Sequence, residues 1–141
     1  MKISDKGINL IKEFEGLELI SYLCPAKVWT IGYGHTKGVQ EGMEWTEEQA
    51  EEALKEEVIG YCRYVEELVE VPLNQNQFDA LTSWTYNLGP TNLKSSTMLK
   101  VLNDGNYDGV PEQIKKWNKA GGQVLNGLIK RRDAEAELFV S

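Results

Sequence analysis

The sequence predicts an α+β protein, mostly α, with a small N-terminal lobe, a long bridging helix and a larger helical lobe. Apolar residues recur with the helical period along most of the chain, whereas residues 19–36 are strand-like and rich in turns. The longest helical pattern separates this segment from the rest. With 141 residues and 41% hydrophobic content, the chain can bury one sizeable core. We expect a single domain, 1–141, divided into an N-terminal lobe (1–45), the bridging helix (46–70) and the helical lobe (71–141).

The first helix is expected to begin after Ser4 and to end before Gly16. Serine is a favoured N-cap, and glycine commonly ends a helix. The apolar face between them is formed by Ile8, Ile11 and Phe14, joined by Leu10. Glu15 therefore lies at the C-terminal end of this helix.

A small antiparallel hairpin is expected between Leu19 and Thr36. The aromatic and β-branched residues from Trp29 to Tyr33 favour a strand, and the pattern is broken at Cys24-Pro25. Gly32 and Gly34 permit close approach of the backbone. A hairpin this short suits the floor of a site more than an independent fold.

Helices are expected over the remainder of the chain. Thr46 and Gln49 form a capping box that opens the bridging helix, which runs toward Pro72. Asn74 with Gln77 opens another helix, which ends at Gly89-Pro90. Helical patterns resume at 96–103, 109–118 and 126–139. The C-terminal half is thus expected to be all helix.

The net charge of −7 is unevenly distributed. Residues 41–70 contain eleven glutamates against Lys55 and Arg63, a net −9, and we interpret this as a solvated helix face. Residues 115–132 contain six basic side chains and no acidic one, which could face an anionic polymer such as nucleic acid or bacterial cell wall. No nucleic-acid-binding motif accompanies them, so a nucleic-acid partner is not expected.

Composition also argues against several other classes. The sequence has no run of about eighteen apolar residues and no basic region followed by an apolar stretch, so neither a membrane anchor nor a signal peptide is expected. Cys24 and Cys62 are too few for a disulfide framework, and with one histidine they form no metal-ligand pattern. We expect reduced thiols, no metal and no cofactor, with Cys62 as a buried apolar residue.

Three residues combine into a catalytic signature: eight residues separate Glu15 from Cys24, and five separate Cys24 from Thr30. This spacing resembles that of the bacteriophage lysozymes, the endolysins of glycoside hydrolase family 24, in which the middle residue is Asp or Cys. The resemblance covers nearly the whole chain. It continues through WTIGYGHT (29–36), YNLG (86–89), SST (95–97) and a closing pattern of Trp117, Ala120-Gly121-Gly122, Gly127-Leu128 and Arg131-Arg132. It implies a lysozyme-like fold with the substrate in a cleft between the lobes.

The resemblance identifies Glu15 as the general acid. Cleaving a glycosidic bond requires protonation of a poor leaving oxygen. At the end of a helix, partial negative charge on the backbone carbonyls disfavours a carboxylate, and Phe14 and Tyr22 could desolvate it. By position alone Glu13 and Glu18 are equal candidates, and the family spacing selects Glu15.

By the same resemblance, Cys24 orients or deprotonates the attacking water or stabilises positive charge at the sugar carbon, and Thr30 holds the water. A hydroxyl suits this role because it both donates and accepts. A thiol with its ordinary pKa of about 8.5 is mostly neutral at pH 7, so it replaces a carboxylate only if that pKa is lowered. Attack by the thiolate, with a covalent glycosyl intermediate, stays an alternative.

The resemblance also suggests a structural ion pair between His35 and Glu57, which we favour over a catalytic role for the only histidine. It places a set of substrate-binding side chains along the cleft: Thr36, Tyr86, Asn87, Thr97 and Gln123.

The function implied is that of a muramidase, a phage endolysin that cleaves the β-1,4 bond between N-acetylmuramic acid and N-acetylglucosamine in peptidoglycan. Such an enzyme, a monomer made in the host cytoplasm, would need a separate holin to reach the periplasm and cell wall at lysis. Two alternatives stay open. A lytic transglycosylase breaks the same bond with one acid/base residue, and a catalytically silent wall-binding module would keep only the cleft.

Overall fold

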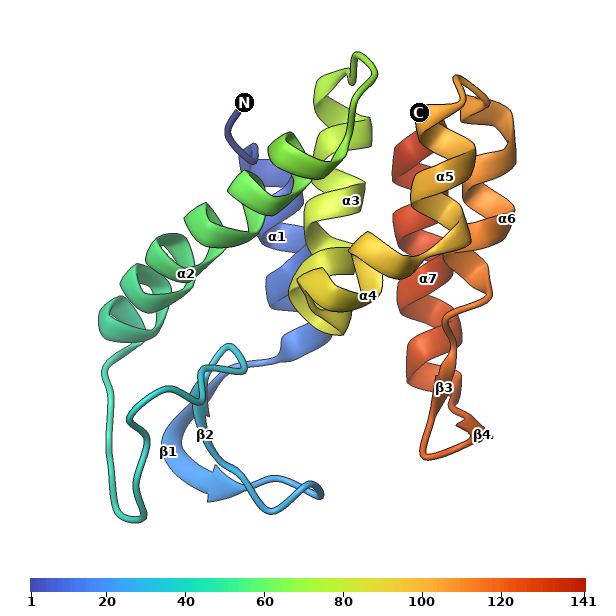
Figure 1. Cartoon of the computed structure of the whole chain (residues 1–141). Coiled ribbons are helices and arrows are strands. Elements are labelled where there is room, and N and C mark those ends of the chain that lie inside the picture. Colours follow the sequence, from blue (N-terminus) through green and yellow to red (C-terminus); the bar gives the residue numbers. More distant parts are fainter.

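The computed structural model describes all 141 residues and confirms the mostly helical α+β class (Figure 1). Its elements follow one another as α1 (Asp5–Glu15), β1 (Glu18–Leu23), β2 (Trp29–Gly32), α2 (Glu47–Leu68), α3 (Gln75–Leu88), α4 (Pro90–Ser95), α5 (Thr97–Asn103), the 3₁₀ turn η1 (Tyr107–Gly109), α6 (Val110–Lys115), β3 (Lys119–Ala120), β4 (Gln123–Val124) and α7 (Asn126–Val140). None of these helices combines the length and the apolar character needed to cross a membrane.

The predicted hairpin is present. β1 and β2 pair antiparallel, with Tyr22 opposite Thr30 and Leu23 opposite Trp29, and the register shifts between Glu18 and Tyr22. The turn between the strands is closed by the Cys24 N–H, which donates to the Val28 carbonyl at 3.0 Å. The hairpin thereby places Cys24 and Thr30 side by side near its tip.

The long bridging helix is α2, which runs diagonally between the hairpin and the remaining helices (Figure 1). The predicted capping box is formed: the Gln49 N–H donates to Thr46 Oγ1 at 3.2 Å, and the Thr46 N–H donates to Gln49 Oε1 at 2.8 Å. Asn74 and Gln77 cap α3 in the same way. Both helices therefore start where local side-chain chemistry directs them to start.

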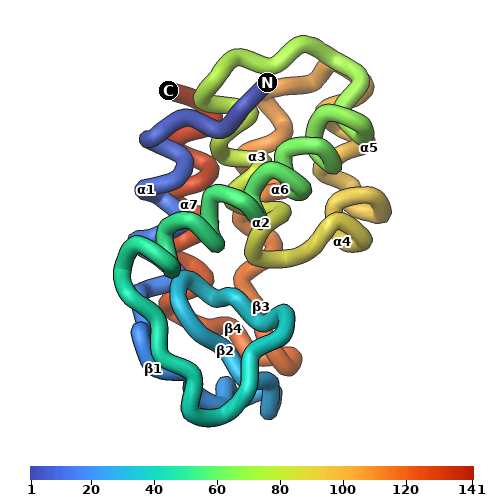
Figure 2. The backbone as a smooth tube through the Cα atoms, turned by 90° about the vertical axis from the view of Figure 1, so that its left-hand side faces the viewer, coloured from blue at the N-terminus to red at the C-terminus, as the bar shows by residue number.

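Two apolar clusters form the interior. The larger one lies among α2, α3 and the C-terminal helices, and its largest fully buried side chain is Trp84. The smaller one joins Ile8 and Ile11 of α1 to Tyr33 and to the first half of α2. α1 contributes to this smaller core and also lies along α3, with α7 close to both (Figure 2). Cys62 is buried, as predicted.

The structure corrects three expectations. Ser4 does not cap α1 with its side chain, because its hydroxyl donates to the Asp79 carboxylate on α3 instead. The C-terminal half is not all helix: the paired glycines at 121–122 form the turn of a short β3–β4 hairpin. The helix expected over 109–118 is the shorter α6, preceded by η1. A helix that was not predicted, α4, starts at Pro90, where proline is favourable in the first turn.

Candidate active site

Glu15 is the last residue of α1, and its carboxylate is held on two sides. Oε2 accepts a hydrogen bond from Nη1 of Arg131 on α7 at 2.6 Å. On the other side the backbone of Gly34 approaches so closely that a Cβ atom there would lie 2.6 Å from Oε1. The Glu15 side chain keeps 18% of its surface exposed. It is therefore a fixed but solvent-accessible carboxylate.

A cavity of about 330 Å³ opens beside this carboxylate. α1, α3 and α7, with the residue that precedes α7, supply its lining: Phe14, Glu15, Asn87, Leu125, Gly127, Leu128 and Arg131. Asn87 was predicted to bind substrate, and its Oδ1 accepts a hydrogen bond from Arg132 Nη2 at 2.8 Å. That bond leaves the Asn87 amide nitrogen available to the cavity. The acid and one predicted binding residue thus share one hollow.

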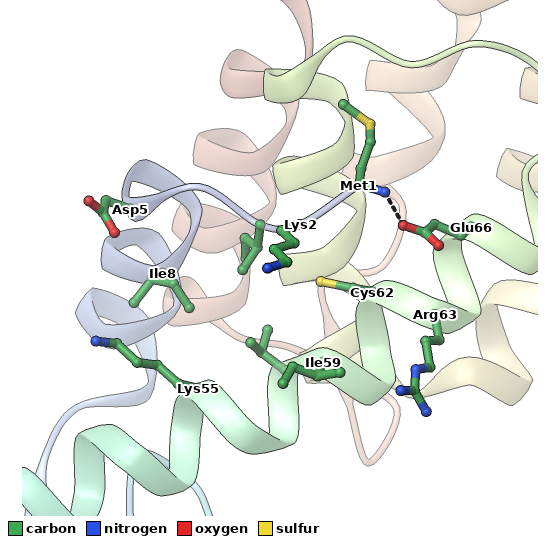
Figure 3. A pocket seen from close by; sticks show the side chains of 11 residues that line it. Met1, Lys2, Asp5, Ile8, Lys55, Ile59, Cys62, Arg63 and Glu66 are labelled. Carbon is green, nitrogen blue, oxygen red and sulfur yellow. Dashed lines mark hydrogen bonds and ion pairs between the residues drawn. The ribbon is translucent and has the colours of Figure 1, made fainter.

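A larger hollow of about 540 Å³ lies elsewhere, between the N-terminal residues and α2 (Figure 3). Cys62 and Ile59 line it, and the Met1 ammonium pairs with Glu66 at one end. It contains none of the predicted catalytic residues.

Cys24 and Thr30 lie together on the hairpin. Thr30 is 95% buried, and its hydroxyl donates to the Val28 carbonyl at 3.0 Å, so its oxygen can still accept. Cys24 is partly exposed. Hydrogen bonding with the backbone at Val28 lowers the pKa of the Cys24 thiol below its ordinary value, and the Thr30 side chain acts in the same direction. The local structure thus favours the thiolate that the proposed chemistry at this position requires.

The Tyr22 phenol interacts electrostatically with two residues of the catalytic signature, Glu15 and Cys24. Its pKa is raised, first by burial and then by the charges of Glu18, Cys24 and Glu15. Tyr22 lies opposite Thr30 in the hairpin. Tyr22 is 39% exposed, so it lies at the surface of the hairpin within electrostatic range of Glu15 and Cys24.

His35 and Glu57 are in contact: His35 Nδ1 lies 2.6 Å from Glu57 Oε1. The other ring nitrogen lies 2.9 Å from the Lys37 carbonyl, and the ring packs against Trp45 with centroids 5.2 Å apart. Both nitrogens are thus committed to oxygen acceptors. This arrangement fits the predicted structural pair and leaves His35 no free nitrogen for proton transfer.

Tyr86, predicted to bind substrate, uses its hydroxyl inside the protein. The hydroxyl donates to the Tyr33 carbonyl at 2.7 Å and lies 3.2 Å from Glu57 Oε2. Burial, followed by the charge of Glu57, raises the Tyr86 pKa. Its hydroxyl links α3 to the small lobe, and only its ring is left for contact with a sugar.

The other predicted binding residues are spread along three segments. Thr36 lies in the loop after β2, Thr97 is the first residue of α5, and Gln123 lies on β4, and all three are exposed. None of them lines the cavity beside Glu15, and their binding roles stay predictions.

Sequence reasoning missed the partners of the acid. Arg131 and Arg132 were noted as part of a closing motif and of the basic segment 115–132 that could face an anionic polymer, which is wrong for these two buried residues, and Ser83 and Glu135 were not noted. All four are buried, and they link α7 to α3 beneath Glu15. Charged residues at positions i, i+1 and i+4 that fall at helical spacing with the apolar Ala136 and Phe139 are a signal that could have revealed the cluster.

A mostly helical fold in which a fixed glutamate borders an open cavity is that of a glycoside hydrolase of the lysozyme type. Residues 12–135 match the family model described as phage lysozyme. An endolysin of Acyrthosiphon pisum secondary endosymbiont phage 1 is 47% identical, with 100% of this chain and 99% of the relative covered. The chain therefore belongs to the phage lysozyme family.

Other relatives agree. The endolysin of Bacillus phage B103 is 46% identical over the whole chain, which spans 55% of that longer protein. The solved muramidase domain of SpmX from Asticaccaulis excentricus is 39% identical, with a TM-score of 0.93 and 99% and 98% of the two chains covered. The lysozyme-like fold expected from the sequence is confirmed.

Proposed function

We propose that the protein is a phage endolysin that hydrolyses the β-1,4 bond between N-acetylmuramic acid and N-acetylglucosamine in peptidoglycan. The observation that carries this proposal is the Glu15 carboxylate, which Arg131 and the Gly34 backbone hold at the edge of an open cavity. The names of the relatives, endolysin and muramidase domain, agree with the same substrate.

In the proposed reaction Glu15, in its protonated form, gives its proton to the glycosidic oxygen as the bond to the sugar carbon breaks. Positive charge then develops at that carbon. Cys24, whose thiol pKa is lowered, stabilises this charge or accepts a proton from the attacking water, and Thr30 offers an oxygen to that water. The alternative is direct attack by the Cys24 thiolate on the sugar carbon as the glycosidic bond breaks. Water then displaces the sulfur from the covalent glycosyl intermediate, and the two inversions together retain the configuration of the sugar.

Peptidoglycan lies outside the cytoplasmic membrane, which determines where such an enzyme acts. We propose that the protein is made in the host cytoplasm, acts as a monomer and reaches the periplasm and cell wall at lysis through a separate holin. Its chemistry uses side chains alone and calls for no cofactor. Of the six basic residues between 115 and 132, Arg131 and Arg132 are buried and paired with carboxylates. The other four are exposed lysines, which suit an anionic wall polymer: Lys115, Lys116, Lys119 and Lys130.

The proposed function is tested by replacing Glu15, the proposed general acid. Glu15→Gln keeps the shape of the side chain but cannot deliver a proton, and positioned proton transfer is worth roughly 10²- to 10⁴-fold in rate. We expect at least that loss in the release of reducing ends from peptidoglycan, with circular dichroism unchanged. Glu13→Gln, an exposed glutamate on the same helix, is the matched control and should keep full activity.

The products distinguish the rival reactions. Hydrolysis adds one water to each cleaved strand, whereas a transglycosylase leaves a 1,6-anhydro end of lower mass. Mass spectrometry of digested peptidoglycan should detect only the hydrated ends. Anhydro ends would identify a transglycosylase, and binding to wall without any release of reducing ends would identify a silent binding module. Activity in Glu15→Gln within a few-fold of wild type would exclude Glu15 as the acid.

A further inference from the structure

Beneath the acid lies a buried cluster of charged side chains that the proposed reaction does not use. Glu135 and Arg132 of α7 are fully buried, and Arg131 is 3% exposed. Ser83 of α3 completes the cluster, and Glu15 of α1 touches it from above. It holds two guanidinium groups and two carboxylates, so its formal charges balance.

Every group that contacts Glu135 can donate a hydrogen bond to it. Its Oε2 accepts from Ser83 Oγ at 2.6 Å, from Arg131 Nε at 3.3 Å and from Arg132 Nη2 at 3.4 Å. Its Oε1 lies 2.8 Å from Arg132 Nε. Burial raises the pKa of Glu135, and the two arginines oppose that effect. The two guanidinium groups are cations that can only donate, so the contacts with them favour the carboxylate form of Glu135.

Arg131 depends on this carboxylate for its orientation. Each of its three nitrogens contacts a different group: Nε contacts Glu135, Nη2 donates to the Ser83 carbonyl at 3.2 Å, and Nη1 donates to Glu15 at 2.6 Å. The guanidinium is planar, so fixing Nε and Nη2 determines where Nη1 points. Glu135 and the α3 backbone therefore fix the direction of Arg131 Nη1, the atom that donates to Glu15.

We propose that Glu135 is a positioning residue for Glu15: it orients Arg131 and balances the positive charge of the two arginines beside the acid. The proposal rests on the proposed role of Glu15 as general acid. Without the negative charge of Glu135, two guanidinium groups would face Glu15 against one carboxylate. Arg131 keeps its hydrogen bond to the Ser83 carbonyl, so the added net positive charge outweighs any loosening of the Arg131–Glu15 contact, and the alkaline limb of the activity profile would move toward acid.

Other groups face Glu15 and must stay unchanged in the comparison. Tyr22 from β1, Tyr61 from α2 and Tyr86 from α3 all interact electrostatically with Glu15. Their pKa values are all raised, first by burial, so these phenols stay neutral where the acid works. Glu57 of α2 lies behind Tyr86 and is paired with His35. None of them contacts Glu135.

The test is the pH dependence of peptidoglycan hydrolysis in Glu135→Gln. We expect the alkaline limb to move toward acid by on the order of half a pH unit to one, which is roughly a three- to tenfold loss of kcat on that limb. Affinity for a chitooligosaccharide should stay within about twofold, because Glu135 does not reach the cavity. Glu135→Asp, which restores the charge, should return the limb toward wild type.

Glu137→Gln is the matched control, because it removes the same charge from the exposed side of the same helix. Its profile should superimpose on that of wild type. A Glu135→Gln profile that differs from wild type only by a constant factor would overturn the proposal, since lost stability scales activity without moving a limb.

If Glu135→Gln does not fold, Ser83→Ala replaces it. This variant removes the 2.6 Å hydrogen bond that stabilises the negative charge of Glu135. The limb should move in the same direction by a smaller amount, and an unmoved limb would overturn the proposal. The proposed function fails separately: it fails if Glu15→Gln is active, whatever the profile of Glu135→Gln.

Discussion

Gly34→Ala tests whether the backbone beside the acid sets its position. Gly34 has φ +78°, in the left-handed region. An added Cβ would lie 2.6 Å from Glu15 Oε1 and 3.4 Å from its Cδ. A long glutamate side chain could normally rotate away, but Oε2 is bonded to Arg131 at 2.6 Å. In Gly34→Ala, therefore, either the Glu15 carboxylate loses its hydrogen bond to Arg131 or the turn after β2 moves away from Glu15.

Two costs can be separated in this variant. The left-handed conformation costs a non-glycine residue about 1–2 kcal/mol of stability, whatever space is available. Gly38 lies four residues on, has φ +71° and would have no atom within 4 Å of an added Cβ. Gly38→Ala therefore carries the backbone cost without the clash. The difference in activity between the two variants isolates the displacement of the carboxylate.

Displacing a catalytic group by about 1 Å can cost about 10²-fold in rate. We expect this loss in Gly34→Ala and activity within about threefold of wild type in Gly38→Ala, with both measured by clearing of a peptidoglycan suspension. Urea denaturation should show a loss of about 1–2 kcal/mol in each. Equal activities in two variants of equal stability would refute the argument that the Gly34 backbone positions Glu15.

Two further predictions concern titrating side chains. Iodoacetamide at neutral pH should label Cys24 much faster than Cys62, because hydrogen bonding lowers the pKa of the Cys24 thiol and burial raises that of the Cys62 thiol. A bound chitooligosaccharide should protect Cys24 from labelling. Equal labelling of the two cysteines, measured by peptide mass spectrometry, would contradict the difference in reactivity. The hydrogen bond from Lys12, at 2.7 Å, lowers the pKa of Glu51 in the folded protein. The stability that this interaction contributes is therefore present above the unfolded pKa of about 4.3, and it is lost as pH falls through the lower folded pKa. Denaturation of Glu51→Gln should differ from wild type at pH 7 and converge with it below about pH 4, whereas Glu52→Gln, on an exposed neighbour, should match wild type throughout.

Features set by nearby residues could be predicted from the sequence. The starts of α2 and α3 follow from capping boxes only four residues long, and the hairpin follows from a strand-like run with a break at Cys24-Pro25. Glu15 was selected by the spacing of the signature, which is a linear property. Cys62 was placed in the core by helical period alone.

Features set by distant contacts could not be predicted in this way. Ser4 stands where an N-cap belongs, yet its hydroxyl bonds to Asp79, 75 residues away. The role of Arg131 depends on Glu15, 116 residues away, and on Ser83. Gly89-Pro90 was interpreted correctly as the end of α3, but the same proline opens α4. A local pattern indicates which conformations and hydrogen bonds a segment can adopt, and the packing of α3 and α7 determines which of them form.

The separation of 116 residues between Glu15 and Arg131 also bears on when the protein becomes active. Glu15 belongs to α1, which is synthesised long before α7, the helix that carries the guanidinium holding it. A growing chain therefore exposes α1 before the helices on which it packs, α3 and α7, exist. Closing so long a loop is entropically costly and is expected late in folding. Glu15 would therefore be held in place only after α7 docks, late in folding.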